Sequence, residues 1–188
     1  MTTAAVVLAA GAGSRFAGPD HKLLTPVRGV PLIALSVANA LAAGLDETIV
    51  VEGAVPLASA LADVRAGLTL LTNEQWADGM ATSLALAVDA AGAAGHEAIV
   101  VGLGDQPAVE AEAWMAVAAA RSPIAVATYD GKRRNPVRLA RDVWPLLDRT
   151  GDEGARTLMR RRPDLVGEVA CRGVAADVDT VEDLTKWN

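Results

Sequence analysis

Cysteine is almost absent from this chain of 188 residues, in which Cys171 is the single example. One cysteine cannot form a disulfide within the chain, and it cannot supply a Cys-x-x-Cys metal site. We expect Cys171 to be a small core or edge residue rather than a nucleophile. A lone thiol is compatible with the reducing cytoplasm, which is the location we expect.

Positive charge is also scarce, because the formal net charge is -6. Surfaces that bind nucleic acids or anionic membranes need a basic patch. The basic runs 132–134 and 160–162 are short and separated, and we expect the second to be a solvated helix face. The apolar run 4–10 follows no basic segment and is too short to cross a bilayer. We therefore predict neither nucleic acid nor membrane as a partner.

Histidine is limited to His21 and His96, and neither has an evident serine or cysteine partner. We expect His21 on a solvated loop and His96 at the surface. Without a nucleophile and base pair, the sequence favours a reaction that needs no protein nucleophile. Phosphoryl and nucleotidyl transfer are of this kind, because positioning and charge neutralisation supply most of their catalysis.

Short apolar runs alternate with helical patterns along the chain, whose residues are 52% hydrophobic. This alternation predicts the α/β class, with a three-layer α/β/α arrangement around a doubly wound, mainly parallel sheet in a single domain over residues 1–188. Strands are predicted at Ala4–Ala9, Thr48–Val51, Leu68–Leu71, Ala98–Val101, Ile124–Thr128, Asn135–Leu139 and Val166–Ala170. Helices are predicted at Pro31–Ala43, Pro56–Ala62, Met80–Ala91, Glu110–Ala120, Asp142–Leu147, Gly154–Arg161 and from Thr180, its cap, onward. The fifth and sixth strands should form a hairpin-like excursion.

The residues after the first strand predict an anion site. Gly11 and Gly13 allow backbone angles and a close phosphate approach that other residues disfavour, and Arg15 and Lys22 follow as two cations. Ligands of doubly wound sheets bind outside the carboxyl ends of the strands. Three polar segments that each follow a strand should therefore meet at one pocket: Gly11–Lys22, Asn73–Gly79 and Asp105–Pro107.

Two common glycine motifs do not explain this loop. A Walker A loop needs Gly-Lys-Ser/Thr, which Gly13-Ser14-Arg15 does not supply. A dinucleotide fingerprint needs a small residue where Phe16 stands and an acid about twenty residues further on, whereas Glu52 comes much later. A nicotinamide-dependent oxidoreductase is therefore a minor alternative.

Asp105 is the most informative acid, because it follows the apolar run Ala98–Leu103 and so stands at a strand end. Magnesium usually takes one or two protein carboxylates and completes its shell with water and substrate phosphates. Asp179 is the candidate second ligand, and Asp177 lies on the same side if the segment is extended. The alternatives are that Asp105 caps the helix near Val109 and that Asp179 is a helix-start acid.

The segment Leu8–Arg15, followed by Lys22-Leu23-Leu24, resembles the signature of nucleotidyltransferases related to the molybdenum-cofactor guanylyl- and cytidylyltransferases. Sugar-phosphate nucleotidyltransferases share that signature. The segment Asn73–Leu84 resembles the family's Asn-x-x-Trp-x-x-Gly-Met-x-x-Ser-Leu block. Three further segments are similar to its later blocks, as in the cytidylyltransferase branch: Leu103–Pro107, Gly151–Arg156 and Asp177–Thr180. The resemblance spans nearly the whole chain in the family's order.

The resemblance implies a Rossmann-type fold like that of nucleotide-diphospho-sugar transferases. It implies transfer of CMP from CTP to the terminal phosphate of a molybdopterin-type cofactor, with release of pyrophosphate, and a molybdenum hydroxylase apo-enzyme as a candidate partner. The catalytic residues would be Arg15, Lys22 and Asp105, and the Mg²⁺ ligands Asp105 and Asp179. The nucleotide would be bound by Leu8, Ala9, Ala10, Gly11, Gly13, Arg15, Lys22, Asn73, Gly79 and Ser83.

The chain also departs from the family pattern. Asn135-Pro136-Val137 stands where the family often has His-Pro-Val, which bears on the contact to the acceptor. GTP or a sugar phosphate could replace the expected substrates, since a few pocket contacts decide the base. Outside this class, a flavin- or nicotinamide-using reductase and a noncatalytic cofactor carrier are the alternatives.

Overall fold

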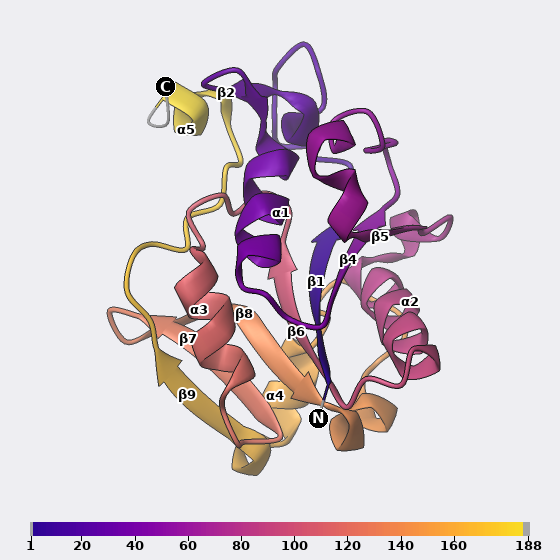
Figure 1. Cartoon of the computed structure of the whole chain (residues 1–188), viewed down its shortest axis with the longest axis vertical. Coiled ribbons are helices and arrows are strands. Elements are labelled where there is room, and N and C mark those ends of the chain that lie inside the picture. The colour runs from indigo at the N-terminus through magenta and orange to yellow at the C-terminus, as the bar shows by residue number, and fades with distance from the viewer. Residues whose placement is uncertain (1, 186–188) are drawn as a thin grey trace.

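Within residues 2–185, which are the part of the chain described by this computed structural model, seven strands form one sheet. The sheet has the order β5-β4-β1-β6-β8-β7-β9 (Figure 1). Its strands are β1 (Thr3–Ala9), β4 (Glu47–Glu52), β5 (Thr69–Thr72), β6 (Ala98–Leu103), β7 (Ile124–Tyr129), β8 (Lys132–Ala140) and β9 (Val166–Ala170). β8 runs antiparallel to both of its neighbours, and the other pairs are parallel. Pro26–Val27 (β2) and Val30–Pro31 (β3) form a separate two-stranded ladder.

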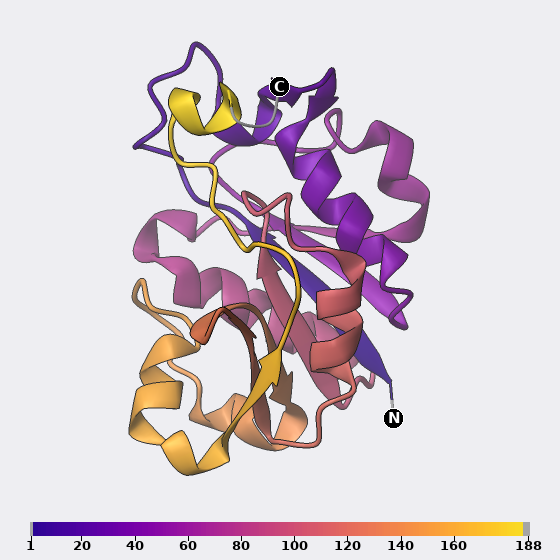
Figure 2. The same cartoon turned by 90° about the vertical axis from the view of Figure 1, so that its left-hand side faces the viewer.

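Helices cover both faces of the sheet, as the view from the side shows (Figure 2). Alternate residues of β1 explain the arrangement, because Ala5 and Val7 pack toward α1 and α3 whereas Val6 and Leu8 pack toward α2 and α4. The predicted three-layer, mainly parallel fold is confirmed. The α-helices are α1 (Leu32–Ala42), α2 (Met80–Ala93), α3 (Ala111–Ala118), α4 (Arg156–Arg161) and α5 (Val181–Thr185). The 3₁₀ helices are Lys22–Leu24, Ala62–Gly67, Trp76–Asp78, Arg141–Leu146 and Pro163–Leu165.

The predicted hairpin is formed by β7 and β8. Asp130 and Gly131 have φ angles of 49° and 74°, which suit the tight turn that matches strand twist. The register then shifts, because Val126 pairs with Val137 whereas its neighbour Ala127 pairs with Arg134. Residues 135–136 are therefore left outside this ladder, and irregularities of this kind redirect a side chain.

The helix predicted at Pro56–Ala62 is wrong. This segment consists of turns, and the helical residues form a 3₁₀ helix at Ala62–Gly67. The buried carboxylate of Glu52 accepts a hydrogen bond from the backbone N–H of Leu57 at 2.6 Å. This bond ties the start of the segment to the end of β4.

The expected surface position of His96 is also wrong. Its side chain is buried, and Nε2 lies 2.8 Å from a carboxylate oxygen of Glu47. The backbone N–H of His96 donates to the carbonyl of Ala91, so the end of α2 turns the ring inward. None of the helices within residues 2–185 combines the length and hydropathy that crossing a bilayer requires.

Candidate active site

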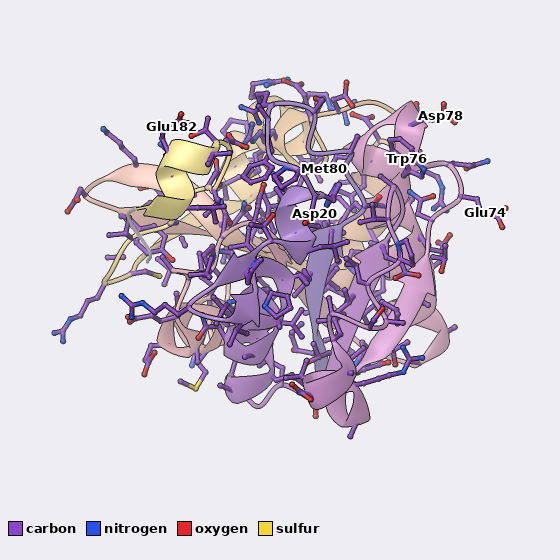
Figure 3. The ribbon with its side chains drawn as sticks, turned by 90° about the horizontal axis from the view of Figure 1, so that it is seen from above. Asp20, Glu74, Trp76, Asp78, Met80 and Glu182 are labelled. Atoms are coloured by element: carbon purple, nitrogen blue, oxygen red, sulfur yellow. The ribbon has the colours of Figure 1, made fainter. Side chains whose placement is uncertain are left out.

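The carboxyl ends of β1 and β6 open onto a cavity of about 630 Å³, which we call the glycine-loop cavity. In the view onto this edge of the sheet, Asp20 and Met80 lie between α5, marked by Glu182, and the turn that carries Trp76 and Asp78 (Figure 3). The glycine-loop cavity is lined by Leu8, Ala9, Ala10, Gly11, Ala12, Gly13, Ser14, Arg15, Lys22, Leu23, Trp76, Ala77, Gly79, Met80, Ser83, Leu103, Asp105, Asp152 and Asp179. The three predicted polar segments thus meet at one site.

Glycine 13 gives the loop after β1 its shape. Gly13 has a φ of 62°, and a Cβ there would lie 3.2 Å from Cγ of Lys22 and 3.3 Å from Nε2 of His21. His21 closes the loop, because its Nδ1 accepts from the N–H of Leu23 and its Nε2 lies 3.0 Å from the carbonyl oxygen of Gly11. His21 lies in the predicted loop and is partly exposed, and these two contacts also make it a structural part of the loop. The lysine stem and the imidazole ring pack where a side chain at Gly13 would project.

Charged side chains meet directly beneath this loop. Nζ of Lys22 lies 2.5 Å from Oδ2 of Asp105 and 3.2 Å from Oδ1 of Asp179. Nη1 of Arg15 lies 2.9 Å from the other oxygen of Asp179. The side chain of Lys22 is 11% exposed and that of Arg15 is 77% exposed, so the lysine is enclosed and the arginine stands at the mouth.

Backbone contacts hold the two acids together. The hydroxyl of Ser36 in α1 donates to the carbonyl of Gly104 at 2.9 Å, and a Cβ at Gly104 would lie 2.7 Å from Cδ1 of Ile33. The N–H of Val178 donates to the carbonyl of Asp105 at 2.9 Å, which brings the segment that carries Asp179 alongside. The capping alternative for Asp105 is not what the structure shows, because the N-cap of α3 is Glu110.

The two carboxylates suit a hard divalent cation. Oδ1 of Asp105 is buried and has no hydrogen-bond partner among residues 2–185. Burial raises the pKa of Asp105 above its ordinary value, although the Lys22 ammonium beside it acts in the opposite direction. No group of three or more histidine, cysteine, aspartate or glutamate side chains in this range could hold a metal. Asp105 and Asp179 are two neighbouring carboxylates, and magnesium usually takes one or two of these when a substrate supplies phosphate oxygens.

The start of α2 forms the opposite wall. Gly79 has a φ of 107°, and a Cβ there would lie 2.5 Å from the carbonyl group of Gly151. That carbonyl accepts from the N–H of Ala81 at 2.8 Å, so residues 151–152 dock against the helix. Asp152 consequently lines the cavity. Sequence reasoning missed this acid, although the Gly151–Arg156 block marked the segment.

Asn73 lies behind the wall rather than on it. Its amide is buried and donates to the hydroxyls of Thr82 at 2.8 Å and Ser83 at 2.9 Å. Asn73 is the only one of the predicted site residues that does not line the glycine-loop cavity. It fixes Ser83, which does.

A second cavity of about 680 Å³ adjoins the first, and both are lined by Leu8, Met80 and Leu103. Four arginines line the second cavity, which we call the arginine cavity: Arg133, Arg134, Arg156 and Arg160. One wall is a chain of hydrogen bonds, in which Asn135 donates to Oε1 of Gln106 at 3.1 Å and Gln106 donates to Asp177 at 2.5 Å. Asp177 and Asp179 thus serve different cavities.

Residues 5–166 match the MobA-like NTP transferase domain. The chain belongs to this family. Nicotine blue oxidoreductase of Paenarthrobacter nicotinovorans is 32% identical over 192 residues, which cover 95% of this chain and 93% of the relative. Purine catabolism protein PucB of Bacillus subtilis strain 168 is 29% identical, with 95% and 92% covered.

Solved structures agree with the family match. A nucleotidyl transferase from Methanothermobacter thermautotroptrophicus has a TM-score of 0.84 and 26% identity, covering 98% of this chain and 95% of its own. Rv0371c from Mycobacterium tuberculosis H37Rv has a TM-score of 0.82 and 31% identity, covering 100% and 97%. A complex of Rv0371c with manganese has a TM-score of 0.79 and 26% identity, covering 100% and 98%. This member of the MobA-like family is a nucleotidyltransferase.

Proposed function

We propose that this nucleotidyltransferase transfers CMP from CTP to the terminal phosphate of a molybdopterin-type acceptor and releases pyrophosphate. The observation that carries the proposal is the cluster in which Lys22 and Arg15 meet Asp105 and Asp179 beneath a glycine loop. A triphosphate needs cations on its oxygens and a metal at the reacting phosphorus, and catalysis consists largely of this positioning. Lys22 and Arg15 would supply the cations, and Asp105 and Asp179 in the same cavity would supply carboxylates for the metal.

Each part of the cluster has a task in the transfer. The loop at Gly11 and Gly13 allows phosphate oxygens to approach the backbone amides, and Lys22 and Arg15 neutralise their charge. Magnesium bound to Asp105 and Asp179 would act as a Lewis acid on the α-phosphate. An oxygen of the acceptor phosphate attacks the α-phosphorus, a new P–O–P linkage forms, and the bond to the β-phosphate breaks as pyrophosphate leaves. The attacking phosphate is already ionised, so the reaction needs no histidine base.

The choice of substrates rests on family resemblance. The Leu103–Pro107, Gly151–Arg156 and Asp177–Thr180 blocks resemble the cytidylyltransferase branch, which favours CTP over GTP. A manganese complex of a similar protein supports a divalent cation, and magnesium is our proposal for this chain. A cytoplasmic site of action and delivery of the product to a molybdenum hydroxylase apo-enzyme belong to the same proposal.

Pyrophosphate release tests this function. The purified protein is supplied with CTP, GTP, ATP or UTP and magnesium, with and without molybdopterin. We expect release with CTP that depends on the acceptor and stops when EDTA removes the metal. Faster release with GTP would overturn the base assignment, and no release with any nucleotide would overturn the reaction. Binding of the cofactor without release would favour the noncatalytic carrier.

A second candidate function is reduction of a small molecule by NADH or NADPH. The observation in its favour is the name of the relative from Paenarthrobacter nicotinovorans, which is an oxidoreductase at 32% identity. Against it, the loop around Gly13 and Phe16 lacks the dinucleotide fingerprint. Nicotinamide oxidation with a redox dye, or a yellow bound flavin in the purified protein, would favour the reductase.

A further inference from the structure

The segment after β9 carries one acid of the glycine-loop cavity. Residues 171–180 form no helix or strand and lead from β9 to α5, which lies at the top of the view in Figure 1. Ala175 and Val178 are buried in the core along the way, so the segment is packed against the protein. Asp179 follows directly, and neither a sheet register nor helix geometry sets the direction of its carboxylate. Other contacts must therefore fix it.

Two hydrogen bonds hold the segment just before Asp179. The N–H of Val178 donates to the carbonyl of Asp105 at 2.9 Å, and the amide of Gln106 donates to the carboxylate of Asp177 at 2.5 Å. These bonds place the main chain up to Val178. They leave the two backbone dihedrals of Asp179 undetermined.

A single oxygen of Asp183 fixes these two dihedrals. Oδ2 of Asp183 accepts from the N–H of Asp179 at 3.2 Å and from the N–H of Thr180 at 3.1 Å. The two N–H groups belong to the peptide planes on either side of the Cα atom of Asp179. Because each plane is rigid, holding both to one oxygen restricts φ and ψ of Asp179 and, with them, the direction of its Cβ atom.

The same carboxylate caps α5. The hydroxyl of Thr180 donates to Oδ2 of Asp183 at 3.0 Å and accepts from the N–H of Asp183 at 3.2 Å, which is the reciprocal pattern of a capping box. Leu184 is buried in the core and anchors the helix. Asp183 is thus held in place from its own side while it holds Asp179.

We propose that Asp183 is a positioning residue for the transfer, because it directs the carboxylate of Asp179 toward Asp105 and so sets the pair that would bind the metal. This direction places the two oxygens of Asp179 3.2 Å from Nζ of Lys22 and 2.9 Å from Nη1 of Arg15. The inference rests on the proposed metal site, since Asp183 itself lines neither cavity. Removal of a group that orients a metal ligand commonly weakens metal binding by roughly 10- to 100-fold.

Metal binding without nucleotide tests this role, with Mn²⁺ as the probe and calorimetry as the measurement. We expect Asp183→Ala to weaken Mn²⁺ binding by about 10-fold. Asp183→Asn keeps an oxygen that can accept from both N–H groups, so its affinity should stay within about 3-fold of that of the wild type. Amide hydrogen exchange at Asp179 and Thr180 should be faster in Asp183→Ala and nearly unchanged in Asp183→Asn.

Thr180→Ala separates positioning from helix stability. It removes the cap hydroxyl but leaves both N–H groups beside Oδ2 of Asp183, so the melting temperature should fall by about 2–4 °C with little change in Mn²⁺ affinity. Asp63→Ala is the matched charge control, because Asp63 is an exposed aspartate in the first turn of the 3₁₀ helix Ala62–Gly67 and lines neither cavity. It should leave Mn²⁺ binding unchanged.

Unchanged Mn²⁺ affinity in Asp183→Ala would overturn the inference. So would an equal loss in Asp183→Asn, which would point to charge at a distance, or in Thr180→Ala, which would point to the stability of α5. Mn²⁺ binding that depends on Asp183 in a protein that releases no pyrophosphate would refute the proposed transfer and leave the positioning role standing. Pyrophosphate release with the same magnesium dependence in Asp183→Ala and the wild type would do the reverse.

Discussion

The two adjoining cavities carry their charges in opposite ways. In the glycine-loop cavity, Lys22 touches both Asp105 and Asp179, so these cations and anions neutralise one another before any ligand arrives. In the arginine cavity, Arg134 and Arg156 form no salt bridge within residues 2–185, although Arg134 donates to the carbonyl of Arg133 and the charge of Arg156 helps to lower the pKa of Glu153. The first cavity must therefore exchange ion pairs when a nucleotide and a metal enter. In the second cavity an anion could bind Arg134 and Arg156 without breaking a salt bridge.

The acids of the two cavities differ in the opposite sense. Burial raises the pKa of Asp105, which has one oxygen without a partner. Hydrogen bonds from Arg160 and Thr157 lower the pKa of the exposed Glu153 to about 2. A metal can satisfy the first carboxylate, whereas the second is already satisfied by protein.

The largest effect should come from Asp105→Asn. The substitution removes the negative charge that would bind the metal, and pyrophosphate release should fall by roughly 10²- to 10³-fold or more while the fold is retained. Calorimetry with Mn²⁺ should show loss of metal binding. Asp20→Asn is the control, because Asp20 is exposed in the same loop region and lines neither cavity. Full activity of Asp105→Asn would refute the metal assignment.

Lys22→Ala should have the next largest effect. Loss of the ammonium group removes a phosphate contact, so CTP binding and turnover should weaken together, by about 10²-fold in kcat/KM. The two carboxylates also lose their cation, and Mn²⁺ should bind the variant more tightly than the wild type when no nucleotide is present. Lys132→Ala, at the exposed first residue of β8, should change neither quantity. Unchanged kinetics for Lys22→Ala would remove Lys22 from the site.

A pair of amide substitutions should separate the two cavities. Asn135→Ala leaves the buried Oε1 of Gln106 without its donor, which should cost about 1–2 kcal/mol of unfolding free energy and raise the KM of the acceptor several-fold. Asn73→Ala releases Ser83 and should raise the KM of CTP instead. Steady-state kinetics with both substrates varied measures the two effects. The comparison fails if either variant changes both KM values equally.

The smallest effect concerns Glu153. Its pKa is lowered from 4.5 to about 2 in the folded protein, so the stabilisation is present above pH 4.5 and is lost as the pH falls toward 2. As the pH falls from 4.5 toward 2, the melting temperature of Glu153→Gln should therefore decrease less than that of the wild type. The group is exposed, so the difference should be small and should shrink at high salt. Parallel melting curves at low salt would contradict the pairing with Arg160.

Much of the fold could be predicted because the local sequence patterns favour the same strands and helices that tertiary packing stabilises. The strand β1 is apolar on both faces and ends at a glycine loop, and Asp105 follows another such strand, so the position of the site followed from the rule for parallel sheets. The ion pairs of Lys22 could not be predicted, because they depend on distances between segments far apart in the chain.

The arginine cavity could not be predicted from the sequence for a different reason. It depends on the register shift between β7 and β8, which takes Asn135 out of the ladder and lets it reach Gln106. No local pattern marks that shift. The buried His96 has a similar origin, since its partner Glu47 lies 49 residues away in the chain.

The most direct test of two sites acting in one transfer is a titration of hydroxymethylpterin phosphate, an analogue of the proposed acceptor, into the protein saturated with magnesium and α,β-methylene CTP, which cannot release pyrophosphate. If the glycine-loop cavity holds the nucleotide and the arginine cavity holds the acceptor, the pterin phosphate binds at one site per chain, with an affinity equal to or higher than that for the free protein. An apparent Kd that rises in proportion to the concentration of the CTP analogue would show competition for one site and would contradict this account.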